Sequence, residues 1–409
     1  MRIVIVGAGV AGCIVAKSLS KLPGAEVICL ERVSADNQSD SGTGLNIGPN
    51  SVRALQWHDP DLLARMDATS FTWDSWRTSL TDGTVLFHLP LSQVADNPGR
   101  RIRWSELYRV LRESAGPVVA YDCIITRVAR SAANFEKTEI EWTQYGESKR
   151  LDDIDLLIAA DGRYSDIRRT ISGEPAISHV GIAISRVLVP DTSNGLIDDY
   201  EQWFNGSNRL LAFRVPPSHI YIAGAFPIAP EKPIPDAMKE APALRAMFTP
   251  PDGKLSDQAV WLIDTICVQA ANNHWARMQE HDVLYADPVS NVLYLGDAAH
   301  GMVPTLGQGA NQAIEDACVA ADLIANAYAA GSRSPRDWLT AIAQARSERV
   351  RFVMDFSLDA SDTMFEGADP VAGSLHKTRP EFLAKLSRVY RGGPGPETKT
   401  KSHPLKGVA

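Results

Sequence analysis

An acidic residue, several glycines and an asparagine stand close together in residues 296–311, which read Gly-Asp-Ala-Ala-His-Gly-Met-Val-Pro-Thr-Leu-Gly-Gln-Gly-Ala-Asn. A short apolar run at 291–295 predicts a buried strand before this segment, and apolar residues at helical spacing predict a helix after it. Asp297 therefore places a carboxylate at a strand end, where it can hold a hydroxyl. Gly307 and Gly309 allow a flat ligand to approach the helix start, which offers free backbone N–H groups and a positive dipole end. The combination suits a cofactor with a polyol chain and a ring that becomes anionic.

A second glycine-rich segment lies at the N-terminus. Residues 2–6 read as a buried strand, and Gly7-Ala8-Gly9-Val10-Ala11-Gly12 follows before a helical stretch. A second strand ends at Glu31, an acid roughly 20 residues further on, as a dinucleotide site requires. The glycines allow a tight turn and close approach to a pyrophosphate, and Glu31 can accept ribose hydroxyls. The pattern indicates a dinucleotide and does not distinguish FAD from NAD.

The third motif is Leu-Leu-Ile-Ala-Ala-Asp-Gly-Arg-Tyr-Ser-Asp-Ile-Arg-Arg at 156–169. It predicts a strand that ends at Asp161-Gly162, followed by a helix start that carries Arg168. Only one GxGxxG is present, so the chain has no second dinucleotide fold for a permanently bound nicotinamide.

In this order, the three motifs resemble those of the single-component FAD-dependent aromatic hydroxylases, the para-hydroxybenzoate hydroxylase family. The resemblance implies that Asp297 holds the ribityl chain of FAD, that the following helix start faces the pyrimidine edge of the flavin, and that Asp161 lies near the pyrophosphate. The expected cofactor-binding residues are Gly7, Gly9, Ala11, Gly12, Glu31, Arg32, Gly44, Arg103, Asp161, Asp297, Gly307, Gly309, Ala310 and Asn311.

The family also implies an arginine in a His-Arg-x-Asp-Leu run. This chain has Arg103-Trp104-Ser105-Glu106-Leu107, which puts Trp104 where that arginine is expected. Arg103 or Arg109 is then the candidate to replace it.

The expected fold class is α/β, with a Rossmann-like FAD-binding domain, an inserted and mostly antiparallel substrate sheet, and C-terminal helices. We expect residues 1–177 and 288–330 to form the discontinuous FAD-binding domain. Residues 178–287 alternate as strands do, with a hairpin around 216–218, and form the expected substrate domain. Residues 331–391 read as helices, and 392–409 as a Gly/Pro/Lys-rich flexible tail.

Candidate substrate-side residues come from three places. The turn-rich run at 41–50 resembles a family segment that lies against the flavin ring, and Asn46 is its expected ring-facing or substrate-facing residue. Phe213 and Arg214 fall where many relatives have Tyr-Pro at the pocket, so Phe213 would pack on a ring and Arg214 would pair with a substrate anion, with a surface position as the alternative. His300 is a candidate proton acceptor or a packed structural histidine. The expected pocket walls are Met302, Val303 and Pro304.

The resemblance implies a monooxygenase with bound FAD, a transient NADH or NADPH cosubstrate and O₂, which works through a flavin C4a-hydroperoxide and needs no metal. The closest resemblance is to the salicylate, 6-hydroxynicotinate and 2,6-dihydroxypyridine hydroxylase branch, so the expected substrate is a small phenolic or hydroxypyridine compound that carries a carboxylate, with decarboxylation as an alternative course. Two alternatives stay open: an oxygenase of a larger polycyclic substrate, and a flavin-binding protein without turnover.

Bulk composition restricts the partners. The net charge is −8 over 409 residues, which argues against a nucleic-acid surface. Five scattered cysteines without CxxC spacing indicate neither a disulfide framework nor a zinc site, and fit a cytoplasmic location. No apolar run approaches membrane-spanning length. We expect a monomer or a homodimer whose partner is a small aromatic molecule.

Overall fold

In the computed structural model, the described part of the protein covers residues 1–409 except 37–42, 133, 135 and 396–409. Gly42, and most of the tail expected at 392–409, therefore lie outside the described residues. A six-stranded sheet forms the first layer. Its neighbouring strands are parallel, except that the edge strand β18 is antiparallel to β19. Its order is β18 (Ala286–Asp287), β19 (Val292–Tyr294), β12 (Leu156–Ala159), β1 (Arg2–Val6), β2 (Glu26–Leu30) and β8 (Val119–Ala120).

Five helices, joined by the N-terminal part of α9 (Pro335–Asp359), share one apolar core with this sheet, and the chain order strand, glycine turn, helix is that of a Rossmann-like unit. These helices are α1 (Val10–Leu19), α2 (Pro49–His58), α3 (Pro60–Asp67), α4 (Trp104–Ala115) and α8 (Gly309–Ala329). Two of them begin with a proline, whose fixed φ suits a first helical turn. The predicted α/β fold class is confirmed.

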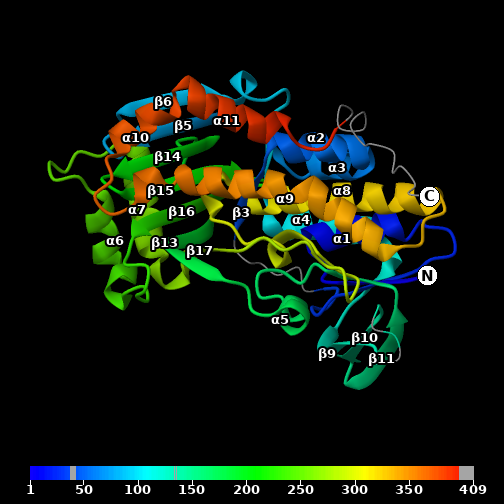
Figure 1. Ribbon diagram of the computed structural model, residues 1–409. Helices are drawn as coiled ribbons and strands as arrows, with labels where there is room; N and C mark the ends of the chain where they lie inside the picture. Colours follow the sequence, from blue (N-terminus) through cyan, green and yellow to red (C-terminus); the bar gives the residue numbers. More distant parts are fainter. Residues whose placement is uncertain (37–42, 133, 135, 396–409) are drawn as a thin grey trace.

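A seven-stranded sheet forms the second layer (Figure 1). Its order is β17 (His274–His281), β13 (Ile177–Pro190), β16 (His219–Pro227), β15 (Asn208–Val215), β14 (Tyr200–Asn205), β5 (Ser75–Leu80) and β6 (Val85–Pro90). The hairpin predicted around 216–218 is present between β15 and β16. Strands β5 and β6 come from outside the expected 178–287 domain, so the substrate unit that we propose also includes residues 75–90.

Two smaller sheets complete the strands. The first is β3 (Gly44–Ile47), β7 (Gly99–Arg103) and β4 (Phe71–Trp73), with β7 in the middle. The second projects from the body as β11 (Glu147–Ile154), β10 (Thr138–Gln144) and β9 (Cys123–Arg130) (Figure 1).

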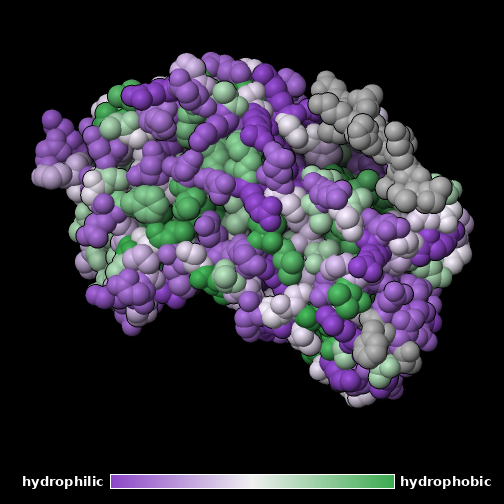
Figure 2. All heavy atoms as spheres, in the orientation of Figure 1, coloured by the Kyte–Doolittle hydropathy of each residue, from purple (hydrophilic) through white to green (hydrophobic). Residues whose placement is uncertain are grey.

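The remaining helices cover the sheets. Helices α6 (Ala241–Phe248) and α7 (Asp257–Val268) share an apolar core with one face of the seven-stranded sheet. Helix α5 (Asp166–Ser172) follows β12. Long α9 (Pro335–Asp359) runs beside α8, and α10 (Pro370–Lys377) and α11 (Pro380–Arg391) follow (Figure 1). No helix in the described ranges is long and apolar enough to cross a bilayer. Figure 2 shows a largely hydrophilic face, with patches of apolar side chains over the seven-stranded sheet and its helices.

Candidate flavin and substrate site

The turn between β1 and α1 combines two glycines required by packing with one that borders open space. An added Cβ would lie 1.8 Å from the Gly7 carbonyl oxygen at Gly12, and 2.4 Å from the Ala160 oxygen at Gly7. At Gly9 the nearest atom would be a Tyr108 ring carbon at 4.0 Å. Helix α1 begins after Gly9 without a side-chain cap, so its first N–H groups remain for a ligand. Ala11 is buried in its first turn.

Two acidic residues flank this turn. Glu31 directly follows β2 and is only 8% exposed; its carboxylate accepts hydrogen bonds from the backbone N–H of Ala8 (2.6 Å) and of Val33 (3.0 Å). The next residue, Arg32, is exposed. Asp161 lies two residues after the end of β12, and its Cα lies 3.0 Å from the position that an added Gly7 Cβ would take. Burial raises the pKa of Asp161, and its Oδ1 has no hydrogen-bond partner in the part of the chain that the structure describes.

The loop before α8 forms a second open cradle. An added Cβ at Gly309 would meet only Asp297 Oδ1, at 3.8 Å, and one at Gly307 would meet nothing within 4 Å. Gly307 has a φ of +62°, which favours glycine. Helix α8 also begins without a side-chain cap, and half-buried Ala310 lies in its first turn. A carboxylate, uncapped N–H groups and missing side chains therefore converge here.

The Asn311 side chain is hydrogen-bonded to backbone groups of the protein itself. Its Oδ1 accepts the backbone N–H of Gly48 (2.7 Å), and its Nδ2 donates to the carbonyl oxygens of Asn46 (3.1 Å) and Gly307 (2.7 Å). Asn311 thus ties the β3–α2 loop to the start of α8. Its expected contact with the cofactor stays a prediction, and its side chain joins two walls of the site.

These two cradles fit FAD. The uncapped α1 start and open Gly9 suit a pyrophosphate, and Glu31 lies where ribose hydroxyls are bound in dinucleotide folds. Asp297 and the α8 start suit a polyol and a ring that gains negative charge. Asp161 follows β12, which lies between β1 and β19 in the sheet. Its buried Oδ1, without a partner among the described residues, therefore stands between the strands that lead into the two cradles.

Comparisons with known proteins agree with this fit. An "FAD binding domain" family model matches residues 269–357. The chain is 26% identical to 2-heptyl-3-hydroxy-4(1H)-quinolone synthase of Pseudomonas aeruginosa, over 86% of this chain and 87% of the relative. It is 28% identical to salicylate hydroxylase of Pseudomonas putida, over 94% and 90%. The solved structure of Klebsiella pneumoniae HpxO complexed with FAD and uric acid has a TM-score of 0.78 at 19% identity, covering 96% and 97%, and shows the same fold.

The family model, the relatives and the solved structures together support an FAD-dependent aromatic hydroxylase. Its cofactors are bound FAD, with NAD(P)H and O₂ as the cosubstrates of this class of monooxygenase.

Strand register defines which face of the seven-stranded sheet this hydroxylase turns toward the flavin cradle. Pairing across β13, β16 and β15 aligns side chains in rows on one face. The three rows are Ile184–Ala225–Arg209, Arg186–Ala223–Leu211 and Leu188–Tyr221–Phe213. An added Cβ at Gly44 would lie 2.8 Å from Tyr221 and 3.1 Å from the Phe213 ring, so this face meets β3. Gly44 is therefore fixed by packing against the sheet.

Aromatic side chains wall one end of this face. Phe213 is 2% exposed, and its ring centroid lies 5.1 Å from that of Tyr221 and 6.0 Å from that of Tyr200. Tyr200 in turn lies 5.5 Å from Trp73 of β4. Asn46 is two residues from Gly44 on β3 and so shares its face; its Oδ1 is buried and has no partner among the described residues. Asn46 thus keeps a polar atom for a ligand on this side.

Two arginines stand on the same face, and sequence reasoning missed both. Arg209 is 5% exposed, and no carboxylate of the described residues lies within ion-pair distance of it or of Arg186. The Nε atoms of both are buried and unpartnered there. Burial lowers the pKa of Arg209 and raises that of Tyr221 to about 12. Strand alternation and register could have identified them. Arg209 is four residues before Phe213 on β15 and therefore shares its face, and Arg186 pairs into the same face through β16.

Arg214 and His300 lie elsewhere. Alternation turns Arg214 away from the face of Phe213, and its guanidinium pairs with Asp191 (2.9 Å) and Asp198 (3.6 Å). The side chain is about one-third exposed, which fits the surface alternative. The His300 ring is fully buried, and its Nε2 lies 2.6 Å from Asp316 Oδ2. Because the ring is shielded from solvent, the structure favours the structural alternative for His300 over that of a substrate base.

Of the three residues expected to wall the pocket, one packs against the substrate-side face of the seven-stranded sheet. Val303 is fully buried and packs in one cluster with Ile184 and Ala225 of the sheet face, whereas Met302 enters a different core and Pro304 is exposed. Two hollows, of about 590 and 350 Å³, lie between β13, β17 and α9 and are lined by none of the predicted site residues.

Another arginine of α4, which the sequence analysis did not select, reaches the glycine turn. Arg109 pairs with Glu106 and Glu113 at the surface, and Arg103 pairs with Glu106 (3.3 Å). Arg112 instead reaches the glycine turn, where its Nε lies 3.4 Å from the Ala8 oxygen and its guanidinium covers the Tyr108 ring. One further helical turn along α4 therefore brings a cation to the pyrophosphate side of the cradle.

Proposed function

We propose that this hydroxylase acts on a small aromatic anion, a phenolic or N-heteroaromatic carboxylate, and inserts one oxygen atom into its ring. The observation that carries this proposal is the pair Arg186 and Arg209, two cations on the flavin-facing sheet with no carboxylate partner in the described chain. Burying an unpaired charge is costly, so such cations are expected where a ligand supplies the anion.

Further residues suit an aromatic ring between the two cradles. Phe213, Tyr221 and Tyr200 offer ring packing on one side. Buried Asn46 Oδ1 accepts a hydrogen bond from a ring hydroxyl or ring N–H on the other. A guanidinium binds a carboxylate through two parallel hydrogen bonds and so fixes the orientation of the ring as well as its presence.

The overall reaction needs NAD(P)H, a proton, O₂ and the aromatic substrate. One oxygen atom enters the ring, the other leaves as water, and NAD(P)H is oxidised to NAD(P)⁺. Bound FAD supplies the redox chemistry between the nicotinamide and O₂. The chain contributes by binding the flavin through Glu31, Asp161 and Asp297, by holding the substrate ring against it, and by keeping water out with the apolar rows of the sheet.

The names of two relatives support the substrate class. One relative is named for salicylate, an aromatic carboxylate, and another for a quinolone, an N-heteroaromatic ring. Both names describe those proteins, and they motivate the panel for this one.

The test is a panel of hydroxybenzoates, hydroxypyridine carboxylates, their neutral amides and larger polycyclic phenols. We expect NADH or NADPH consumption and a product mass increased by one oxygen for a carboxylate, with the matched amide at least tenfold poorer in kcat/KM. A mass that also lacks CO₂ identifies decarboxylative hydroxylation. Turnover of polycyclic phenols alone would replace the proposal by the larger-substrate alternative, and FAD binding without any turnover would favour the non-catalytic one.

A further inference from the structure

A cluster of four buried charges lies beneath the start of α8. Glu315 and Asp316 belong to α8, and Arg346 and Arg349 to α9. Arg346 pairs with both acids, at 2.8 Å to Glu315 and 2.7 Å to Asp316, and Arg349 lies 2.9 Å from Glu315. The side chains are 0% exposed for the acids, and 3% and 12% exposed for the arginines. Two negative and two positive charges cancel within this interior.

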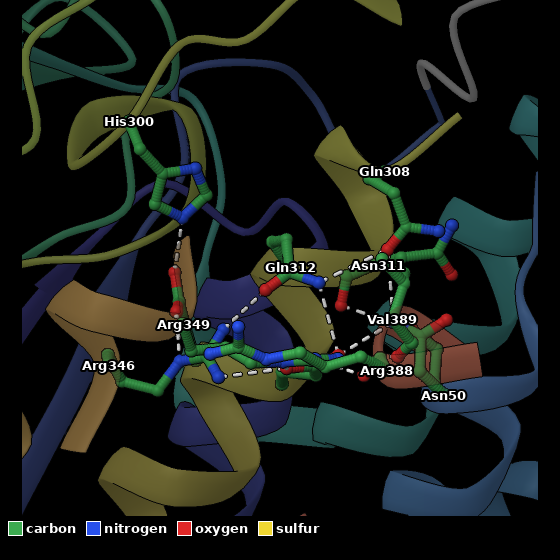
Figure 3. Close-up of polar contacts among 12 residues, drawn as sticks. Asn50, His300, Gln308, Asn311, Gln312, Arg346, Arg349, Arg388 and Val389 are labelled. Carbon is green, nitrogen blue, oxygen red and sulfur yellow. Dashed lines mark hydrogen bonds and ion pairs between the residues drawn. The ribbon is translucent and has the colours of Figure 1, made fainter. Parts of the chain in front are cut away.

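Amide side chains connect the cluster to the residue that precedes α8. Asn50 Nδ2 donates to Glu315 Oε1 (2.6 Å) and to Gln308 Oε1 (3.1 Å). Gln312 Oε1 accepts from Arg346 (2.8 Å), and its Nε2 donates to Gln308 Oε1 (3.1 Å). Figure 3 shows these amides between the arginines and the start of the helix. Gln308 is the N-cap residue of α8, so the charges lie two hydrogen bonds from the flavin-facing helix start.

The same cluster also holds the loop that carries Asp297. Asp316 Oδ2 accepts the backbone N–H of Gly296 (3.0 Å) and lies 2.6 Å from His300 Nε2. Gly296 and His300 are the two ends of the segment around Asp297.

Because this region excludes water, a change of one charge is weakly screened and acts over a longer range than it would at the surface. The N–H groups of the α8 start are the protein groups expected to stabilise the negative charge of reduced flavin. We propose that the Glu315–Asp316–Arg346–Arg349 cluster holds two parts of the flavin site in position, the start of α8 and the loop that carries Asp297. We further propose that its balanced charge sets the reduction potential of the bound flavin. The inference rests on the flavin placement given under Proposed function.

Two variants with opposite charge test the proposal on the FAD-loaded enzyme. Glu315→Gln leaves one uncompensated positive charge and should raise the flavin midpoint potential, whereas Arg349→Gln leaves a negative one and should lower it. The double variant Glu315→Gln/Arg349→Gln restores neutrality and should return toward the wild-type value. Arg349→Lys keeps the charge and should preserve the potential even if it weakens FAD binding. Midpoint potentials are measured by anaerobic dye equilibration, and FAD affinity by fluorescence titration.

The exposed ion pair Arg245–Asp264 (2.6 Å) between α6 and α7 provides the matched control. Arg245→Gln there should leave the potential unchanged. Shifts of the same sign in both single variants, or unchanged potentials in variants that retain FAD, would reduce the cluster to a purely structural role and overturn the inference. If a single variant does not fold, the double variant and Arg349→Lys still test the inference. Both keep the net charge of the cluster, so a midpoint potential that differs from the wild-type value in either variant would contradict control by net charge. A wild-type protein that does not bind FAD would instead refute the proposed function itself.

Discussion

At the scale of single residues, the two arginines of β15, Arg209 and Arg214, stand five positions apart and make opposite predictions. Arg209→Gln should weaken binding of the carboxylate substrate by on the order of 2–4 kcal/mol, because a buried charged hydrogen bond is lost. That loss is roughly 30- to 700-fold in Kd. Arg214→Gln is the matched control: its partly exposed pair with Asp191 lies off the ring-binding face, so less than about a threefold change is expected from a surface ion pair. Substrate titration of flavin absorbance checks both, and equal losses in the two variants would contradict the assignment.

Asp297 gives the second prediction at this scale. Its carboxylate lies beside open Gly309, so Asp297→Asn should weaken FAD retention by roughly 1.5–3 kcal/mol through loss of a charge-assisted hydrogen bond. FAD content after dialysis and the titrated Kd measure the effect. Retention equal to that of the wild type would show that the carboxylate does not hold the cofactor.

At the scale of elements, the β1–α1 turn separates folding from binding. Gly12→Ala would force a Cβ to within 1.8 Å of the Gly7 oxygen, so the apo protein should be strongly destabilised. Gly9 has a φ of −83° and open space beyond it, so Gly9→Ala should leave the apo melting temperature nearly unchanged and weaken FAD binding instead. Thermal scans without FAD and FAD titrations test the pair. A destabilised apo Gly9→Ala protein would mean that this glycine serves packing as well.

The α8–α9 contact predicts a pH dependence. Burial acts to raise the pKa of Glu315, but Arg349 and Arg346 override it and lower the pKa to about 2. A depressed acid stabilises the fold above its unfolded pKa, near 4.3, and this contribution is lost as the pH falls through about 2. Glu315→Gln should therefore cost on the order of 3–5 kcal/mol at pH 7, with a gap to wild type that narrows below pH 4. Urea unfolding at several pH values measures it, and a gap independent of pH would exclude this carboxylate as the titrating group.

At the scale of the whole molecule, substrate is expected to control flavin reduction. The described residues form one dinucleotide fold, so we expect the flavin to meet NAD(P)H and substrate from different positions. Because Asn311 ties the β3–α2 loop to the α8 loop, this movement must occur between walls that stay joined. Anaerobic stopped-flow bleaching by NADH and NADPH should be slow alone and at least tenfold faster with the true substrate. A bleaching rate that no aromatic acid changes would contradict this control.

The sequence by itself determined the fold class, the order of the flavin motifs and the strand-turn-helix context of each. Local chemistry explains this success: glycines at a tight turn, a carboxylate at a strand end and a following apolar periodicity are all properties of neighbouring residues. The hairpin at 216–218 and helices α9 and α11 follow from the same kind of local pattern.

Only the tertiary structure decided which polar residues face the ligand. Arg209 and Arg214 look alike in sequence, but strand alternation and register with β16 send them to opposite faces. His300 follows a flavin motif, yet Asp316, sixteen residues later, draws its ring into the interior. The recruitment of β5 and β6 into the substrate sheet, and the closure of the charge cluster by α9, depend on contacts far apart in the chain, which no local pattern of residues records.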